Sequence, residues 1–528
     1  MQSETKRVNE NHHIARAAGI VGSATLISRI LGYLRDMLIA GFLGAGPVSD
    51  AFIAAFRLPN MLRRLYHEGT FSMAVVPAMT DCLTRRGQKA AVDLARAALQ
   101  VSSVLLLLLS GICALAAPWI IRGLAYGLSD APATFNLAVD LQRIMSGYIF
   151  FIGLVALSMG LLNALGHFAA PALAPALLNL GIIGAVVTAV RFTSDPTFLS
   201  YALAIGVLIG GCMQLALQIP FLVKCGIDFW HRSDWRHPGL NKIRTMIVPV
   251  MFGGSVFQLN TLIGTLLASF LVEGSISYLY YADRLVQLPL GLFGIATATA
   301  IMPTLSRQAV TQNARALVVT LQYAVRLLAL IMLPAMVGII VVREPIIALL
   351  FEHGAFDARA SRLTADAVLY YGIGLWAFAA IRIVIATFYA LGDTRTPARI
   401  AVVCLLANIV LGLVLMEYMG HGGIALALTL ATVLNLLLLV RPLHRRLGPL
   451  GAIKLLGSVT KSLTAAAIMG IAVWWLVRNW LDRTTLFNHL VGLTAIIAAG
   501  VLIYAGLTIL LQGRQVLRLL NPKKQAIR

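Results

Sequence analysis

Long apolar stretches alternate with short polar connections along almost the whole chain. An α-helix needs about 20 apolar residues to cross a bilayer, and fourteen stretches approach or exceed that length. They cover residues 17–41, 48–80, 92–117, 137–165, 170–191, 199–223, 244–271, 277–306, 315–342, 362–391, 398–417, 422–442, 455–478 and 487–511. The pattern therefore predicts an all-α polytopic membrane protein with 14 transmembrane helices.

The basic residues of the connections gather on alternate loops. One set of loops and the C-terminal tail contain Arg85, Arg86, Lys89, Lys224, Arg232, Arg236, Lys242, Arg395, Arg441, Arg445, Arg446, Arg514, Arg518, Lys523, Lys524 and Arg528. The other set contains little beyond Arg122, Arg191, Arg343, Arg359, Arg478 and Arg483. Because cytoplasmic loops carry the excess of Lys and Arg, we expect the first set and both chain termini in the cytoplasm. The first helix lacks a small-residue cleavage site and is expected to be an uncleaved signal anchor.

Sequence patterns recur at a nearly constant spacing of 226 to 228 residues. The matched pairs are Phe42-Leu43 with Phe270-Leu271, Pro77 with Pro303, Pro118 with Pro345, and the Ala-Leu-Gly-x4-Pro-Ala segments at 164–172 and 390–398. The repeat predicts two pseudo-symmetric six-helix lobes, related by an axis along the membrane normal, with a cavity between them. The expected parts are an N-lobe at 14–225, a cytoplasmic basic linker at 226–241, a C-lobe at 242–445, two further helices at 455–511 and a basic cytoplasmic tail at 512–528.

Composition narrows the class of protein. Only 12% of the 528 residues are charged and the mean hydropathy is +0.85, whereas soluble domains carry about 25% charged residues. The net charge of +21 is explained by the loop arginines and lysines, so a nucleic-acid partner is not expected. The five cysteines are isolated and fit no metal-binding spacing. Without a nucleotide-binding or metalloprotease motif, we expect a transporter rather than an enzyme, with no cofactor and no metal.

Charged residues lie inside the first two apolar stretches. Those between residues 28 and 77 are Arg29, Arg35, Asp36, Asp50, Arg57, Arg63, Arg64 and Glu68, and the eighth stretch adds Asp283 and Arg284. Each such charge near the centre of a spanning helix costs at least ~2.5 kcal/mol, so a function is expected to require them. The alternative is structural: Arg64 and Glu68 are spaced to pair on one helix face, and Asp36 and Asp283 each adjoin an arginine that they could orient.

Arginines outnumber the acids in this set. A guanidinium binds phosphate oxygens in a bidentate manner and keeps its proton. A proton-coupled drug exporter would more naturally place a titratable carboxylate at its centre. The excess of arginine therefore predicts an anionic ligand, and a phosphate or pyrophosphate headgroup fits best.

The same residues form motifs that resemble a known family. Ser28-Arg29-Ile-Leu-Gly32-x-x-Arg35-Asp36, Asp50-Ala-Phe52, Arg57-Leu-Pro59-Asn60-x-Leu-Arg63-Arg64, Glu68-Gly69-x-Phe71-Ser72, Tyr280-Tyr-Ala-Asp283-Arg284 and Gly392-Asp393-x-Arg395-Thr396-Pro397 resemble the MurJ/MviN family of lipid II flippases. The resemblance covers nearly the whole chain. It implies the fold of the MOP exporter superfamily, with two six-helix lobes and two C-terminal helices that form a groove for the lipid tail.

The resemblance also implies a substrate and a site. The substrate would be lipid II, undecaprenyl-pyrophosphoryl-disaccharide-pentapeptide, moved from the cytoplasmic to the periplasmic leaflet of the bacterial inner membrane for peptidoglycan synthesis and cell shape. The implied substrate-binding residues are Arg29, Arg35, Arg63, Arg284, Ser28, Asn60 and Ser277, and the expected supporting charges are Asp36, Asp50, Arg57, Arg64, Glu68 and Asp283. Membrane lipids and cell-wall synthesis enzymes are the other expected partners.

The expected mechanism is alternating access powered by the membrane potential or an ion gradient, without ATP hydrolysis. Three alternatives stay open at this point. One is a flippase for another polyprenyl-linked glycan, such as O-antigen, and another is a cation-coupled multidrug exporter of the same fold. The third is a membrane scaffold that recruits cell-wall enzymes through its basic loops, which would have no need of intramembrane arginines.

Overall fold

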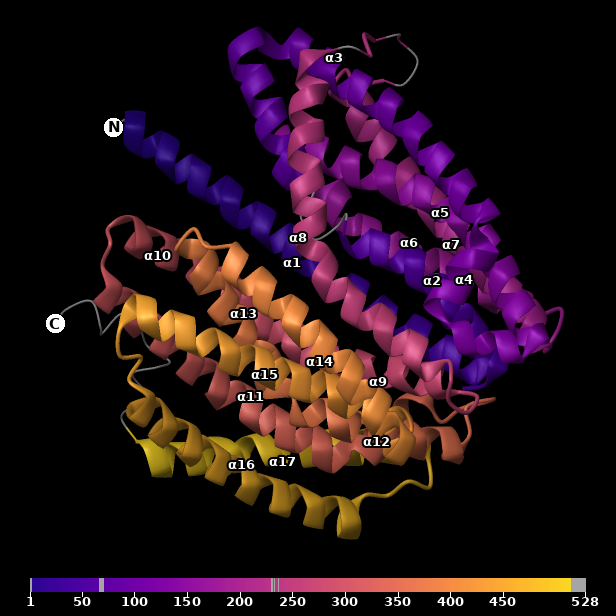
Figure 1. Cartoon of the computed structure of the whole chain (residues 1–528), viewed down its shortest axis with the longest axis vertical. Coiled ribbons are helices and arrows are strands. Elements are labelled where there is room, and N and C mark those ends of the chain that lie inside the picture. Colours follow the sequence, from indigo (N-terminus) through magenta and orange to yellow (C-terminus); the bar gives the residue numbers. More distant parts are fainter. Residues whose placement is uncertain (1, 66–70, 229–230, 232, 236, 514–528) are drawn as a thin grey trace. The chain divides into compact units, whose positions relative to one another are not determined.

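The computed structural model describes residues 2–65, 71–228, 231, 233–235 and 237–513, and within these ranges the regular structure is entirely helical. Figure 1 shows the helices coloured along the chain. The first half contains α1 (Gln2–Leu43), α2 (Pro47–Leu65), α3 (Phe71–Leu115), α4 (Ala117–Leu124), the 3-10 helix η2 (Tyr126–Asp130), α5 (Pro132–Ala164), α6 (Ala169–Ala189), α7 (Pro196–Lys224) and α8 (Pro238–Ala268). The second half contains α9 (Ser275–Pro289), the π-helical turn η3 (Leu290–Ile295), α10 (Ala296–Val310), α11 (Ala314–Phe351), α12 (Ala358–Ile373), α13 (Leu375–Ala390), α14 (Arg395–Met419), α15 (His421–Leu447), α16 (Ala452–Trp480) and α17 (Leu486–Gln512).

Many of these helices have the length and composition of membrane spans. Ten meet both requirements among the described residues, and the pair α12 and α13, bent by 42° at their junction, makes an eleventh if it is one span. Helices α1 and α2 are not in this group, because their apolar residues are interrupted by charge. Four charged residues fall within the 19 residues of α2. The prediction of an all-helical polytopic membrane protein is therefore confirmed.

Helix α3 is two helical arms joined at Gly87. The backbone of Gly87 has φ 82° and ψ 178°, a conformation that glycine adopts readily because it has no Cβ. Arg85, Arg86 and Lys89 flank the turn and are exposed. The connection that was predicted as a basic cytoplasmic loop is thus a tight turn between long helices.

The chain forms two compact units, one ending at Gly274 and the other beginning at Ser275. Helix α8 packs with the first unit, although the sequence repeat counts it as the first helix of the second half. Its start is tied to α3, where Lys242 Nζ lies 2.9 Å from Asp81 Oδ2. Near its end, the Gly127 N–H donates to Ser269 Oγ at 3.0 Å.

The segment before α8 is also bound to α3. Arg96 Nη2 donates to the Gly226 carbonyl at 2.8 Å and contacts Asp228 Oδ2 at 2.6 Å. The His231 backbone N–H and side chain both bond Asp228, and these bonds, with Arg96, lower the pKa of the Asp228 carboxyl to about 2. The described part of the predicted linker is therefore fixed to the first unit by charged and polar contacts.

In the second unit, α16 and α17 pack on α11 (Figure 1). Met469, Val473 and Leu493 belong to an apolar cluster that joins the three helices. Within the same contact, the Tyr504 hydroxyl donates to the Leu330 carbonyl at 2.8 Å, and Gln512 Nε2 donates to Ser462 Oγ at 2.8 Å. The last two helices are thereby held to the second unit by both apolar and polar contacts.

The sequence repeat at 164–172 and 390–398 has the same backbone conformation in both copies. Gly166 and Gly392 have φ values of +80° and +74°. The N–H of His167 bonds Leu162 O at 2.8 Å, and the N–H of Asp393 bonds Phe388 O at 2.9 Å. Each helix therefore ends in the glycine-dependent capping turn that the shared motif encodes.

Candidate substrate-binding site

The charged stretch of α1 contains a buried ion pair. Arg35 and Asp36 are 7% and 2% exposed. Arg35 donates to Asp36 Oδ1 from Nε at 3.0 Å and from Nη2 at 2.7 Å. The carboxylate offsets the desolvation of the guanidinium and fixes the plane of its fork.

Asn179 of α6 completes the coordination of Arg35. Its Oδ1 accepts from Arg35 Nη1 at 3.0 Å, and its Nδ2 donates to the Ser28 carbonyl at 3.0 Å. One amide thus bridges two points of α1, on either side of Arg29. Sequence reasoning missed Asn179; its signal was a lone amide within the apolar helix α6, and such intramembrane polar residues are often functional.

Arg29 differs from Arg35 in its surroundings. It is half-buried on α1, and within the described part of the chain it makes no hydrogen bond or ion pair. The cost of holding a guanidinium in this position is therefore not offset by a carboxylate from the described residues. Arg29 can accept an anionic ligand without first breaking a protein contact.

The C-terminal half of α2 supplies a third arginine. Arg63 donates from Nε and Nη2 to Asn60 Oδ1 at 3.1 and 2.9 Å. The i,i+3 spacing puts both side chains on one helix face. A neutral amide orients this guanidinium without cancelling its charge. Arg57 and Arg64 are half-buried on the same helix, and Glu68, expected to pair with Arg64, lies outside the described residues.

Asp50 lies at the other end of α2, ~20 Å along the helix from Arg63 at 1.5 Å per residue. It is 4% exposed, and its Oδ2 accepts from the Gly274 N–H at 2.7 Å. Asp50 also stands in the first helical turn, where a negative charge is favoured by the helix dipole. This contact fixes the connection that follows α8.

Within the second unit, the predicted residue Arg284 lies on α9. Its guanidinium carbon lies 4.7 Å from the centroid of the Tyr280 ring, and its Nη2 donates to Tyr280 Oη at 2.8 Å. Asp283 accepts from Gln287 Nε2 at 3.2 Å, and Ser277 is fully buried. Tyr280 therefore orients Arg284 without neutralising it, as Asn60 does for Arg63.

Five of the predicted residues on α1 and α2 fall into two hydrogen-bonded groups. These are the Ser28 carbonyl with Arg35 and Asp36 through Asn179, and Asn60 with Arg63. Arg63 and Arg284 each bond a neutral group on their own helix, and Arg29 has no hydrogen bond or ion pair among the described residues. Such a set favours an anion with several oxygens, such as a phosphate group. Among the described residues, no group of three or more His, Cys, Asp or Glu side chains could hold a metal ion.

Comparison with known proteins identifies the relatives of this chain. The family model described as "Lipid II flippase MurJ" matches residues 39–494. A curated protein from Vibrio cholerae, "Probable lipid II flippase MurJ", is 36% identical over 96% of this chain and 97% of its own length. The "Lipid II flippase MurJ" of Burkholderia cenocepacia is 37% identical over 82% of this chain and 84% of its own length.

Solved structures extend the comparison to the fold. "Lipid II flippase MurJ, inward closed conformation" superposes with a TM-score of 0.77 at 27% identity, covering 94% of this chain and 99% of that one. An inward-facing multidrug resistance transporter of the MATE family in the MOP superfamily superposes with a TM-score of 0.64 at 16% identity, over 82% of this chain and 99% of that one. At 16% identity, the similarity to the MATE transporter shows a shared fold and nothing more.

Proposed function

The chain belongs to the MurJ family of lipid II flippases, and we propose that it moves lipid II from the cytoplasmic to the periplasmic leaflet of a bacterial cytoplasmic membrane. It is a transporter and not an enzyme. The substrate would be undecaprenyl-pyrophosphoryl-disaccharide-pentapeptide, whose pyrophosphate is the group that arginines can bind most strongly. Close similarity over nearly the full length of curated relatives supports this assignment.

The proposed topology has fourteen spans in two six-helix lobes followed by two C-terminal helices. Eleven spans are the ten membrane-length helices and the bent pair α12 and α13. The others are α1, α8, and α2 continued by the first arm of α3. Charged residues interrupt the apolar stretches of α1 and α2, whereas α8 has no charge between residues 245 and 268. Both chain termini then lie in the cytoplasm, as the distribution of loop arginines and lysines requires.

We propose that Arg29, Arg35, Arg63 and Arg284 bind the pyrophosphate, with Ser28, Asn60 and Ser277 as polar contacts. Asp36 orients Arg35, and Asp50, Arg57, Arg64, Glu68 and Asp283 support the charge network. The observation that carries this proposal is Arg29, a half-buried guanidinium on a membrane helix with no partner among the described residues. A visiting anion would supply the charge that the described protein groups do not.

The proposed mechanism is alternating access. Arginine repulsion disfavours closure around an unliganded site, and the bound pyrophosphate removes that penalty. The membrane potential contributes ~2.3 kcal/mol per elementary charge per 100 mV. An inside-negative potential favours outward movement of the anion and inward return of the cationic site, so ATP hydrolysis is not required. An ion gradient is the alternative energy source for this mechanism.

The two C-terminal helices are proposed to accommodate the polyprenyl tail. Ile471 of α16 and Leu502 and Leu510 of α17 are exposed by 67%, 72% and 79%. Apolar surface of this kind is stable only against hydrocarbon. The polyprenyl tail and neighbouring membrane lipids provide this hydrocarbon. The polar contacts to α11 keep both helices in place.

The test is translocation of lipid II by purified protein in proteoliposomes. Arg29→Ala should lower the rate about 10- to 100-fold, because a charge-assisted contact with phosphate is worth about 1.5–3 kcal/mol. Arg143→Ala, which removes an exposed arginine paired with Asp140, is the matched control and should stay near the wild-type rate. An Arg29→Ala variant that folds and still translocates lipid II at the wild-type rate would refute the proposed site.

A further inference from the structure

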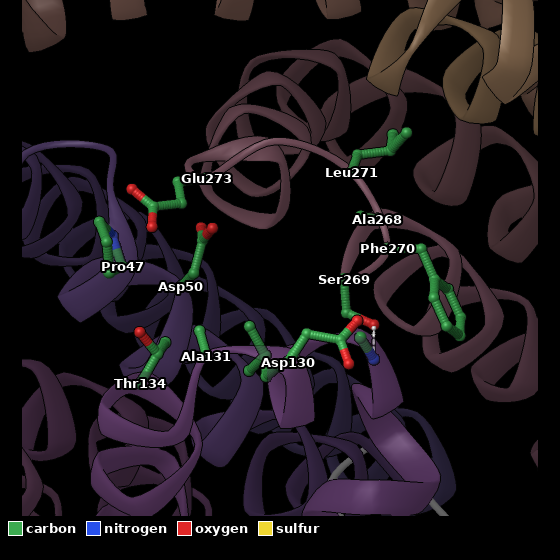
Figure 2. A pocket seen from close by; sticks show the side chains of 12 residues that line it. Pro47, Asp50, Asp130, Ala131, Thr134, Ala268, Ser269, Phe270, Leu271 and Glu273 are labelled. Atoms are coloured by element: carbon green, nitrogen blue, oxygen red, sulfur yellow. Dashed lines mark hydrogen bonds between the residues drawn. The ribbon is translucent and has the colours of Figure 1, made fainter.

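A polar cavity lies at the end of the first unit where α2 begins. It has a volume of about 220 Å³ and is formed by the start of α2, the segment from Gly127 to Thr134 and the connection after α8. With the proposed topology this end faces the periplasm. Figure 2 shows Asp50 and Glu273 on one wall, with Asp130 and Ser269 on the other.

The charge of this cavity is negative throughout. Asp50, Asp130 and Glu273 line it, and no lysine, arginine or histidine is among the lining residues. The Asp50 carboxylate bonds the Gly274 N–H at 2.7 Å. Asp130 and Glu273 are exposed and have no hydrogen bond or ion pair within the described part of the chain. Like charges gathered on one cavity repel one another unless a cation joins them.

Thr134 provides an independent indication of a ligand. Its side chain is only 9% exposed, and its hydroxyl has no hydrogen-bond partner among the residues that the structure describes. Figure 2 shows this side chain rising from α5 toward Asp50. Thr134 lines the cavity, and its hydroxyl is not among the buried atoms that lack a partner, so it is accessible from the cavity. A bound group that offers a hydrogen bond there would give this hydroxyl a partner.

The geometry limits what kind of cation can bind. No three carboxylates among the described residues are close enough to coordinate one metal ion directly. A volume of about 220 Å³ exceeds several times the ~30 Å³ that one water occupies in the liquid. The site therefore suits a compact cation with N–H or water O–H donors, held by hydrogen bonds rather than by inner-sphere ligation.

We propose that this cavity binds such a cation, either a primary ammonium group or a metal ion that keeps its water shell. The three carboxylates accept its hydrogen bonds, and the Thr134 hydroxyl takes part in the same network. The Ser269 hydroxyl is already engaged, since it accepts from Gly127 N–H and donates to the Leu266 carbonyl at 2.7 Å. Because Asp50 holds Gly274, an occupied site stabilises the connection between α8 and α9.

The experiment measures thermal unfolding of the purified full-length protein during titration with ethylammonium chloride or with magnesium chloride. Ionic strength is held constant with tetraethylammonium chloride, whose cation has no N–H donor. A ligand of the folded state raises the unfolding temperature in a saturable manner. Saturation with ethylammonium alone identifies an ammonium site, and saturation with magnesium alone identifies a hydrated metal ion.

The variants separate the cavity from general charge effects. The double variant Asp130→Asn, Glu273→Gln should raise the apparent dissociation constant at least ~10-fold, and Thr134→Val should raise it several-fold. Glu344→Gln removes an exposed acid from α11, outside the cavity. This variant should have the same apparent dissociation constant as the wild type. The proposal fails if neither salt gives a saturable shift, if tetraethylammonium acts equally well, or if the double variant responds as the wild type does.

Discussion

Asn179 on α6 and Arg35 on α1 are joined by a 3.0 Å hydrogen bond across 144 residues of sequence. The same amide donates to the Ser28 carbonyl. These two bonds fix the position of α1 along α6 at the level of the candidate arginines. Arg29 lies between the two bonded points, so its position depends on Asn179 even though no hydrogen bond joins them in the described structure.

Asn179→Leu should therefore damage both stability and transport. The substitution removes a partner of a buried guanidinium, which costs about 1–3 kcal/mol, and it frees α1 to shift. We expect a lower unfolding temperature and a decrease of at least ~10-fold in lipid II translocation. Asn179→Asp keeps the acceptor oxygen but adds a second buried acid near Arg35, and it should retain more stability than Asn179→Leu.

Asn479→Ala provides the control for that substitution. Asn479 is exposed, and its Nδ2 donates only to the Trp475 carbonyl within its own helix. Surface changes of this kind are usually within about 0.5 kcal/mol. Equal effects of Asn179→Leu and Asn479→Ala on unfolding would contradict the bridging role.

Sequence reasoning predicted the arginines of this site but not their supports. Arg35 beside Asp36 and Asn60 three residues before Arg63 are local patterns, so their pairing can be expected from helical geometry. Asn179 is far away in the chain, and without the packing of α1 on α6 nothing connects it to Arg35. The spans were predictable for a similar reason, since apolar length is a local property.

The Asp50–Gly274 hydrogen bond gives a second prediction. Asp50→Ala should leave the Gly274 N–H without its acceptor, at a cost of about 1.5–3 kcal/mol for a bond to a charged group. Hydrogen exchange of the Gly274 amide should become faster by one to two orders of magnitude. Asp50→Asn retains an acceptor oxygen and should exchange at an intermediate rate. Unchanged exchange in Asp50→Ala would mean that the carboxylate does not hold this connection.

Tyr280 and Arg284 permit a graded test in the second unit. Tyr280→Phe removes the hydroxyl that accepts from Arg284 but keeps the ring beneath the guanidinium, so we expect a loss of less than ~10-fold in translocation. Tyr280→Ala also removes the cation–π contact, worth about 0.5–2 kcal/mol, and should lose more. Tyr418→Phe changes a tyrosine that is 84% exposed and should have no effect. Equal rates for Tyr280→Phe and Tyr280→Ala would exclude a role for the ring.

Asp393, between α13 and α14, leads to a prediction about pH. Bonds from the Thr396 hydroxyl and backbone N–H, together with the Arg446 guanidinium 2.6 Å away, lower the pKa of the Asp393 carboxyl. A lowered pKa means that the folded state favours the ionised form. The stabilisation is therefore complete above the ordinary pKa of about 3.9 and is lost as the pH falls below it.

Comparing the wild type with Asp393→Asn tests whether this stabilisation is lost as the pH falls. The difference in unfolding temperature should be largest at pH 6 and should shrink as the pH approaches 3. Arg446→Gln removes the ion pair but keeps the bonds from Thr396, so it should leave part of the difference in place. A constant difference between pH 6 and pH 3 would show that ionisation of Asp393 does not contribute.

Other parts of the fold depend on packing that a single sequence does not display. The repeat aligns α8 with the second half of the chain, yet its bonds through Lys242 and Ser269 are to the first unit. The π-helical turn after Pro289 has no distinctive composition either. Hydrophobic periodicity shows which face of each helix is apolar, but it describes each helix separately. Which helix faces pack against one another depends on their shape complementarity in three dimensions.

The crossing of α6 and α7 gives the last prediction. A Cβ atom on Gly181 would lie 2.6 Å from the Cα of Gly210, whereas one on Gly184, a turn away on α6, would meet nothing within 4 Å. Membrane helices approach this closely only where small residues meet. Gly181→Val should thus separate the helices at a cost of about 1–3 kcal/mol or more, with a lower unfolding temperature and reduced translocation, since α6 also positions Asn179. Gly184→Ala should be neutral or slightly stabilising, because alanine is the better helix former. If both variants unfold at the wild-type temperature, the close crossing of α6 and α7 is refuted.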